Sequence, residues 1–354
     1  MGKKSPSITD VARRAGVSIS TISRAMNDRN RLNPKTYEKV QRAIRELKYH
    51  KARRGPATSR LRTVAVVVPT ILDPFFSVVL HGIETMAKTY AYNILLFDSC
   101  NSPEIELKNV TRILETAPDG VVFVPSSNST TGYRMLRKAQ VPVVLLDRLM
   151  EKEESDYVIS NDVEGAFLAV KYLIDLGHRN IQYIGGNHNT STEEARLRGY
   201  TRALAEHGIP LCKDRVSECS FESESAYEIM KKILGRGNAE FSAVFAANDL
   251  IAIGARKALE EAGLRVPHDI SLVGYGDMPF TSLICLTTIS CPALEMAKSA
   301  LSLLIQIIEK KFISSRRIVM RPTLVLRSSC RRIAYAQDAS PDNSPELARV
   351  MSAK

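Results

Sequence analysis

The sequence predicts two parts, a small all-α domain followed by a larger α/β domain built on parallel sheets. The first 62 residues contain 17 basic and 4 acidic residues and carry three short amphipathic helical patterns. From Val64 onward, short runs of Val, Ile and Leu alternate with helical patterns, which is typical of parallel sheets covered on both faces. That part carries 32 basic and 34 acidic residues, so the positive excess lies at one end of the 354-residue chain.

Composition excludes several classes of protein. No run approaches roughly 18 consecutive apolar residues, so we expect no membrane-spanning helix and no membrane partner. The basic start Met1-Gly2-Lys3-Lys4 is followed by polar sequence, unlike a secretory signal. The six cysteines include no Cys-x-x-Cys pair and are expected to be reduced thiols. These observations predict a cytoplasmic protein.

Residues 8–47 contain three helical patterns, each with one apolar face. These faces consist of Ile8, Val11, Ala12 and Ala15, of Ile22, Ala25 and Met26, and of Tyr37, Val40, Ile44 and Leu47. We expect Thr9 or Asp10 to cap the first helix and Ser18 the second, while Asn33-Pro34 starts the third. Gly16 follows the first face, where a tight turn requires a residue that accepts positive φ.

Two short helices joined by a glycine-containing turn and braced by a third form a helix-turn-helix unit. The outer face of the second helix carries small polar residues and one arginine, namely Ser20, Ser23, Arg24 and Asn27. Such a face allows a close approach to base edges, and the surplus of positive charge favours a polyanion as partner. A purely structural bundle is the alternative. We therefore predict that this unit binds DNA.

The unbroken run from Ile8 to Asn27, ITDVARRAGVSISTISRAMN, resembles the amino-terminal signature of the lactose-repressor (LacI/GalR) family of bacterial transcription regulators. The resemblance implies that Ile19 and Ser20 open the recognition helix and read bases. Arg24 is the other base-reading candidate, because arginine pairs with guanine through two hydrogen bonds. The residues assigned to phosphate contacts are Ser18, Thr21, Ser23 and Asn27. Alternatively, Arg24 is a solvated or intramodule charge and Ile19 is partly core.

In that family, a hinge segment after this unit folds on DNA and inserts a leucine into the minor groove. Here Gly55-Pro56 stands where helix is expected, Thr58 matches the inserted position, and Leu61 lies three residues later. Either the hinge helix begins at Pro56 and uses Leu61, or the linker is a basic tether. In both cases Arg53, Arg54, Arg60 and Arg62 are expected to attract phosphates.

The larger domain has seven predicted strands, at 64–68, 93–97, 121–124, 143–146, 181–184, 243–246 and 270–273. Helical patterns include 78–90, 166–176, 196–206, 226–234 and 252–262. Parallel sheets bind ligands beyond the carboxyl ends of their strands. Polar, charged and aromatic side chains follow or lie near these ends. The ligand-site candidates are Asp73, Phe75, Phe76, Asp147, Arg148, Arg196, Phe221, Asn248 and Asp277.

These side chains suit a neutral polyol. The guanidinium groups of arginine donate hydrogen bonds to neighbouring hydroxyls, and carboxylate and amide oxygens accept hydrogen bonds from them. Phe75 and Phe221 cover the apolar C–H faces of the ligand. Each has a structural alternative: Asp147, Asn248 and Asp277 as helix caps, the phenylalanines as core, and Arg148 and Arg196 in internal ion pairs.

Signatures of catalysis are missing from the sequence. It has no dinucleotide fingerprint, no Walker loop and no Gly-x-Ser-x-Gly elbow, and Gly274-Tyr275-Gly276 lacks the third glycine and the following helix. The six histidines show no metal-ligand spacing. We therefore expect no enzyme, no cofactor and no metal.

Residues 64–330 resemble the effector domain of the same family, which is itself similar to periplasmic ribose-type sugar-binding proteins with two lobes around a ligand. The matching segments are Asp73–Phe76, Pro142–Arg148, Ala195–Tyr200, Phe245–Asp249, Gly274–Asp277 and Thr287–Ile289. The resemblance implies that all of the ligand-site candidates except Phe76 contact a sugar, although purine-binding members share the scaffold. Cys291 stands near a position where several members have a polar, ligand-facing residue.

We therefore predict a helix-turn-helix DNA-binding domain at 1–52, a hinge at 53–63, a two-lobed effector and dimerisation domain at 64–330 and a disordered tail at 331–354. The predicted function is a ligand-responsive transcription regulator, a repressor that binds a palindromic operator as a homodimer. A sugar-binding protein for transport is the alternative, and an α/β enzyme with a DNA-binding arm is a third possibility.

Overall fold

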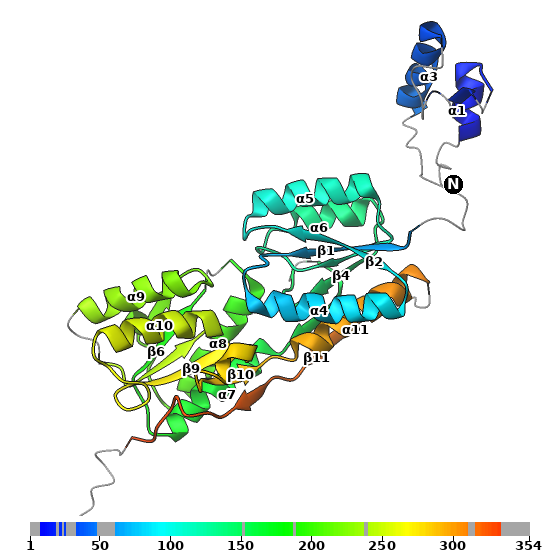
Figure 1. Ribbon diagram of the computed structural model, residues 1–354. Coiled ribbons are helices and arrows are strands. Elements are labelled where there is room, and N and C mark those ends of the chain that lie inside the picture. Colours follow the sequence, from blue (N-terminus) through cyan, green and yellow to red (C-terminus); the bar gives the residue numbers. More distant parts are fainter. Residues whose placement is uncertain are drawn as a thin grey trace, which may run out of the picture. The chain divides into compact units, whose positions relative to one another are not determined.

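The chain divides into two compact units, Met1–Leu61 and Arg62–Lys354. The computed structural model in Figure 1 describes residues 8–18, 21–22, 25, 33–47, 61–150, 153–186, 189–236, 240–310 and 316–333.

The described residues of the first unit form a small helical core. It contains α1 (Ile8–Ala15), α3 (Pro34–Leu47) and helical residues at 21, 22 and 25. The residues at its centre are Val11, Ala12, Ile22, Ala25, Val40 and Ala43, with Ala15, Val17, Tyr37, Ile44 and Leu47 packed against them. The three predicted apolar faces are therefore confirmed, except that the side chains of Ile8 and Met26 lie outside the described residues.

The helix ends in this unit follow the expected local chemistry, with one exception. Gly16 has φ +66° directly after α1, Ser18 Oγ accepts from the Thr21 amide at 3.2 Å, and Asn33 Oδ1 accepts from the Lys35 amide at 3.0 Å. The prediction that Thr9 or Asp10 caps the first helix is wrong, because α1 begins at Ile8 and both residues lie in its first turn.

The first lobe of the second unit is built on a parallel sheet with strand order β11-β5-β4-β3-β1-β2. Its strands are β1 (Thr63–Val68), β2 (Asn93–Asp98), β3 (Gly120–Phe123), β4 (Val143–Leu146), β5 (Asp156–Ser160) and β11 (Arg317–Met320). Its helices are α4 (Pro74–Thr89), α5 (Pro103–Thr116), α6 (Thr131–Lys138) and α11 (Ala293–Ile308).

Strand β1 shows why both faces of this sheet are covered. Its even-numbered valines, Val64 to Val68, share a core with residues of α4 and α11, whereas Ala65 and Val67 share another with residues of α5 and α6. Figure 1 shows these helix pairs on opposite sides of the sheet.

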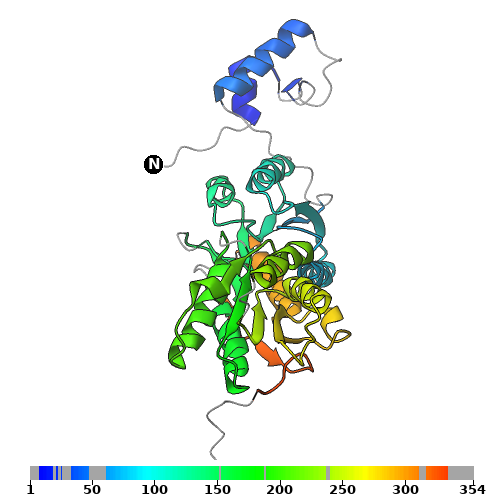
Figure 2. The ribbon, with the colours of Figure 1, turned by 90° about the vertical axis from the view of Figure 1, so that its left-hand side faces the viewer.

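The second lobe has a sheet with order β12-β10-β9-β8-β6-β7, in which only the β10–β12 pair is antiparallel among the described strands. Its strands are β6 (Ile181–Gly185), β7 (Val216–Glu218), β8 (Ala243–Ala246), β9 (Ser271–Gly276), β10 (Thr287–Ser290) and β12 (Thr323–Val325). Its helices are α7 (Asp162–Asp175), α8 (Ser191–Glu206), α9 (Ser223–Gly235) and α10 (Asp249–Glu261), with short 3₁₀ turns η2 (Lys213–Arg215) and η3 (Pro279–Thr281). Figure 2 shows its green helices on one side of the strands and its yellow helices on the other.

The chain passes between the lobes after β5, β10 and β11. Each lobe is therefore assembled from separate stretches of sequence, with the crossings grouped between the two sheets. Such crossings allow two rigid lobes to change their relative orientation without unfolding either of them.

Helices α4 and α11 approach closely at Gly82, where a Cβ atom would lie 2.7 Å from Ala297 Cβ and 2.8 Å from the Leu294 carbonyl oxygen. We expect Gly82→Ala to force the helices apart and to lower the free energy of unfolding by about 1–3 kcal/mol, measured by urea denaturation. Gly235→Ala is the control, because a Cβ at Gly235 in α9 would have nothing within 4 Å. Equal stability of the Gly82→Ala variant and the wild type would contradict this close contact.

The chain remains attached to the second lobe through Ile333. The Ile333 amide donates to the Leu176 carbonyl at 2.9 Å, and the Arg331 amide donates to Ser271 Oγ at 3.0 Å. The predicted start of a disordered tail at residue 331 is therefore wrong, and residues 334–354 lie outside the described residues. Within the described ranges, none of the helices has the length and apolar character needed to cross a bilayer.

Candidate functional site

The first unit contains only some of the predicted DNA contacts among its described residues. Ser18 is exposed, and its hydroxyl lies 2.8 Å from the Thr21 hydroxyl, so both oxygens stand at the start of the second helical segment. Leu61 is 76% exposed. The predicted contacts that lie outside the described residues are Ile19, Ser20, Ser23, Arg24, Asn27, Arg53, Arg54 and Arg60.

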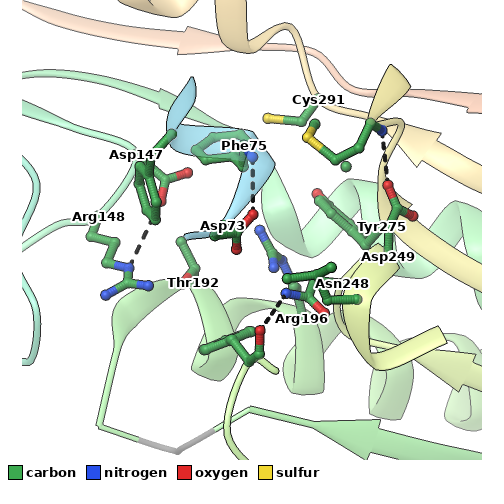
Figure 3. Close-up of a pocket in the computed structure, with 15 residues that line it drawn as sticks. Asp73, Phe75, Asp147, Arg148, Thr192, Arg196, Asn248, Asp249, Tyr275 and Cys291 are labelled. Carbon is green, nitrogen blue, oxygen red and sulfur yellow. Dashed lines mark hydrogen bonds and ion pairs between the residues drawn. The ribbon is translucent and has the colours of Figure 1, made fainter. Parts of the chain in front are cut away.

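In the second unit, a cavity lies between the lobes, at the carboxyl ends of strands from both sheets (Figure 3). Its position is the one expected for a ligand site of parallel sheets. It is lined by Asp73, Phe75, Phe76, Asp147, Arg148, Thr192, Arg196, Phe221, Asn248, Asp249, Leu250, Tyr275, Gly276, Met278 and Cys291.

Eight of the nine predicted ligand-site candidates line this cavity, and Asp277 does not. Asp277 Oδ1 accepts from Arg327 Nη2 at 2.7 Å and from Thr281 Oγ1 at 3.1 Å, so its carboxylate serves an internal ion pair. The expectation that Asp277 lies with the others is therefore wrong, although its neighbours Gly276 and Met278 line the cavity.

Two of the candidates also cap helices. Asp73 Oδ1 accepts from the Phe75 amide at 2.9 Å at the start of α4, and Asn248 Oδ1 accepts from the Ile251 amide at 2.7 Å at the start of α10. Asn248 Nδ2 also donates to the Phe221 carbonyl at 3.4 Å. One oxygen of each side chain therefore holds a helix end in place.

Arg196 is the centre of a buried polar group. Its Nη2 lies 3.3 Å from Asp162 Oδ1, its Nη1 donates to the Ala247 carbonyl at 2.8 Å, and its guanidinium lies 4.1 Å from the centre of the Tyr275 ring. Tyr275 donates its hydroxyl proton to the same Asp162 oxygen at 2.6 Å. Burial acts to lower the pKa of Arg196, but Asp162 and Tyr275 raise it above its ordinary value. This arginine is therefore held as a cation mainly by the protein itself.

The hydrogen bonds of Arg148 differ from those of Arg196. Its Nη1 donates to the Pro125 carbonyl at 2.9 Å, while its Nε is buried without a hydrogen-bond acceptor among the described residues and lies 3.8 Å from Asp147 Oδ2. Burial lowers the pKa of this arginine. Arg148 therefore retains a buried donor that no described residue satisfies.

The carboxyl groups around the cavity are shifted toward their neutral forms. Burial raises the pKa of Asp147 to about 7 against the opposing effect of Arg148, and Asp162 adds to the rise. Burial also raises the pKa of Asp73, while the Phe75 amide opposes the rise. The pKa of Asp249 rises to about 6 by burial. Such shifts are frequent in functional sites.

Thr192, Tyr275 and Met278 also line the cavity, and the sequence gives no signal for them as single residues. Asp249 lines it too; it follows the predicted strand 243–246, although it is not one of the nine candidates. Asp249 and Tyr275 lie inside the segments Phe245–Asp249 and Gly274–Asp277, which resemble segments of the family's effector domain. Asp249 is structural, since it accepts from Thr288 Oγ1 at 2.6 Å and from the Met278 amide at 2.9 Å. Cys291 is buried beside Met296, with 3.6 Å between the sulfur atoms.

The Gly274-Tyr275-Gly276 segment has a packing role. A Cβ at Gly274 would clash with the Asp249 carboxylate, and Gly276 has φ +133°, which side chains rarely accept. Elsewhere in the described chain, no group of three or more His, Cys, Asp or Glu residues is placed to hold a metal ion.

Two family descriptions match the chain. Residues 7–51 match "Bacterial regulatory proteins, lacI family", and residues 170–330 match "Periplasmic binding protein-like domain". The HTH-type transcriptional repressor PurR of Vibrio parahaemolyticus is 31% identical over 331 residues, which cover 92% of this chain and 99% of the relative.

Solved structures agree with this assignment. The complex of the transcriptional regulator CelR with cellobiose has a TM-score of 0.72 and 29% identity, covering 92% of this chain and 99% of that one. The lac repressor dimer bound to operator and the anti-inducer ONPF has a TM-score of 0.70 and 26% identity, covering 93% and 100%. The chain therefore belongs to the lacI family of bacterial regulatory proteins, and it is a DNA-binding transcription regulator with a periplasmic-binding-protein-like effector domain, not an enzyme.

Proposed function

We propose that this regulator is a cytoplasmic repressor that binds a palindromic operator as a homodimer and responds to a sugar or a related metabolite in the cavity between its lobes. Residues 1–52 bind DNA, residues 53–63 form the linker and residues 64–330 bind the effector and a second copy. The effector favours one relative orientation of the lobes and alters DNA affinity through its differential affinity for the two states.

The buried Nε of Arg148, which lacks an acceptor among the described residues and faces the Asp147 carboxylate, carries the effector proposal. A ligand with neighbouring hydroxyls offers an acceptor to the arginine and donates to the carboxylate. Phe75 and Phe221 offer apolar faces to its C–H groups. The similar CelR structure, which holds cellobiose, supports a sugar over other polar metabolites.

Exposed apolar side chains on and near strand β2 support the homodimer. Strand β2 forms an edge of the first sheet, and its Leu95 and Leu96 are 36% and 46% exposed. Ile71 and Leu72 are also exposed, and the Ile71 amide donates to Asp98 at the end of β2. Exposed apolar clusters of this kind mark interfaces, and a two-fold dimer matches the two half-sites of a palindrome. The similar lac repressor structure is a dimer on operator.

Four measurements on the full chain test this function. Selection from random duplexes is expected to enrich an inverted repeat, and sedimentation is expected to show a dimer. A thermal-shift screen with D-ribose, cellobiose and hypoxanthine is expected to identify a sugar, because a ligand at 100 times its Kd stabilises the folded state by about 2.7 kcal/mol. That sugar must also change the Kd for the selected duplex. No preference for any duplex would refute the DNA role, and stabilisation by hypoxanthine alone would refute the sugar.

The base-reading assignment of Arg24 gives a separate prediction. We expect Arg24→Ala to weaken binding to the selected duplex by about 1–3 kcal/mol and to leave binding to random DNA nearly unchanged, because only the specific complex uses its base contact. Fluorescence anisotropy at fixed salt measures both affinities. Lys39→Ala removes an exposed charge from α3 and serves as the control. Equal losses on both duplexes for Arg24→Ala would assign it to phosphate.

A further inference from the structure

Arg62, the first residue of the second unit, holds the ends of two helices. Its Nη1 donates to the carbonyl of Tyr90, the C-cap of α4, at 3.3 Å, and its Nη2 lies 3.2 Å from Oε1 of Glu309, the C-cap of α11. Its guanidinium also lies 4.4 Å from the centre of the buried Tyr92 ring. The fixed fork of a guanidinium can serve both acceptors at once, and a cation is favourable at helix C-termini.

The same two helices begin at the cavity between the lobes. Asp73, which lines the cavity, caps α4, and Phe75 lies in the first turn of that helix. Cys291, another lining residue, stands two positions before the start of α11 at Ala293. Each helix has 16 residues and therefore spans about 24 Å. Both helices thus run from the cavity to Arg62.

Helices α4 and α11 lie side by side (Figure 1) and are expected to move as a pair. Their close contact at Gly82 leaves no room for a Cβ beside Ala297. A second link joins Tyr90 to Ser302, whose hydroxyl oxygens lie 3.4 Å apart. Close-packed elements transmit displacements rather than absorb them, so a shift at the cavity end of this pair reaches its other end.

The backbone of Arg62 is fixed to the sheet. Its carbonyl accepts from the Asn93 amide at 2.8 Å, and the next amide, that of Thr63, donates to Asp119 Oδ2 at 2.9 Å. A relative movement of the helix pair and the sheet therefore acts directly on the Arg62 side chain. The residues that precede it lead to the DNA-binding unit.

We propose that Arg62 is a positioning residue that couples the cavity to the segment leading to the DNA-binding unit, by holding the C-terminal ends of α4 and α11 together. This proposal rests on the proposed function, because it requires that occupation of the cavity alters DNA affinity. Arg62 takes no part in binding the effector.

Arg62→Met in the full chain tests the coupling. One of three compounds, D-ribose, cellobiose or hypoxanthine, is chosen because it stabilises the wild type. We expect that compound to raise the Tm of the variant by the same amount as the Tm of the wild type. In allosteric proteins an effector usually changes the affinity for the other ligand by about 5–150-fold. We expect the change in Kd for the selected duplex that the compound causes to be about three- to tenfold smaller in the variant than in the wild type, because one partly exposed ion pair and one cation–π contact are lost. An undiminished change would overturn the proposal.

Other variants separate coupling from stability. Glu309→Gln keeps an acceptor for Arg62 and is expected to retain more coupling than Arg62→Met. Arg265→Met breaks the exposed Arg265–Asp269 pair in the second lobe, where Nε lies 2.9 Å from the carboxylate, and is expected to retain full coupling. An equal loss in Arg265→Met would assign the effect to general destabilisation.

If none of the three compounds stabilises the protein, the proposed sugar response fails, and amide hydrogen exchange still decides the role of Arg62. Arg62→Met is then expected to raise exchange at the far ends of both helices, in residues 75–77 and 293–296, relative to Arg265→Met. Faster exchange confined to residues 61–64, 90–93 and 309–310 would show a local contact only and would overturn the proposal.

Discussion

Replacing Arg196 with methionine is expected to lower the free energy of unfolding by about 3–5 kcal/mol, because it leaves the buried Asp162 carboxylate without its cation. Asp162 is 5% exposed, and the guanidinium supplies two of its contacts, from Nε and Nη2 to Oδ1. The Ala247 carbonyl also loses its donor at 2.8 Å. Thermal unfolding followed by circular dichroism measures the loss.

The control lies on the same helix. Arg202 is half exposed and pairs with Glu206 and Glu164, so Arg202→Met is expected to cost no more than about 1 kcal/mol. Adding Asp162→Asn to Arg196→Met removes the uncompensated charge and is expected to recover part of the stability. If Arg196→Met costs no more than Arg202→Met, the proposed internal role of Arg196 is wrong. Any loss of effector response in Arg196 variants must therefore be compared with their Tm.

The sequence was informative where a single residue type meets a local requirement. Turn and cap chemistry predicts the roles of Gly16, Ser18 and Asn33, and each has the expected geometry. Each predicted strand is present within a few residues, because a strand buried on both faces requires a continuous apolar run. Strands such as β7 (Val-Ser-Glu) and β10 (Thr-Thr-Ile-Ser) lack such a run, so the apolar pattern does not predict them.

The cavity shows the limit of the same reasoning. The positions of Asp147, Arg148 and Asn248 after predicted strands indicate the cavity, because the carboxyl ends of parallel strands meet at one edge of a sheet. The spacing of residues in the sequence does not show which way a side chain points after the strand ends. Asp277 follows β9 as Asp147 follows β4, yet the Asp277 carboxylate pairs with Arg327, fifty positions later, and Asp277 does not line the cavity. A partner so distant in the sequence is visible only in three dimensions.

Asp147→Asn is expected to stabilise the protein at pH 8 by an amount on the order of 2–4 kcal/mol, because each pKa unit corresponds to about 1.4 kcal/mol. Burial raises the pKa of Asp147 from 3.8 to about 7. A carboxyl group with a raised folded-state pKa favours folding while it is protonated, and this contribution is lost as the pH rises from about 4 through 7. Asparagine never ionises, so the variant and the wild type should converge near pH 4 and diverge toward pH 8 in urea unfolding.

Asp269→Asn is the control of opposite sign. Its exposed carboxylate has a lowered pKa because it accepts hydrogen bonds from Arg265, so this variant is expected to lose stability at neutral pH and to approach the wild type in acid. If Asp147→Asn behaves like Asp269→Asn, then Arg148 rather than burial dominates the Asp147 carboxyl group.

The same ionisation connects stability with effector binding. A sugar hydroxyl that donates to Asp147 favours its ionised form, so sugar affinity in the wild type is expected to fall as the pH drops below about 7. Asp147→Asn is therefore expected to be the more stable protein and the weaker sensor, with an affinity that varies less with pH. Titration of the sugar at pH 6 and pH 8 measures this. Unchanged affinity in Asp147→Asn at both values would remove Asp147 from the effector contact, while the stability prediction would stand on its own.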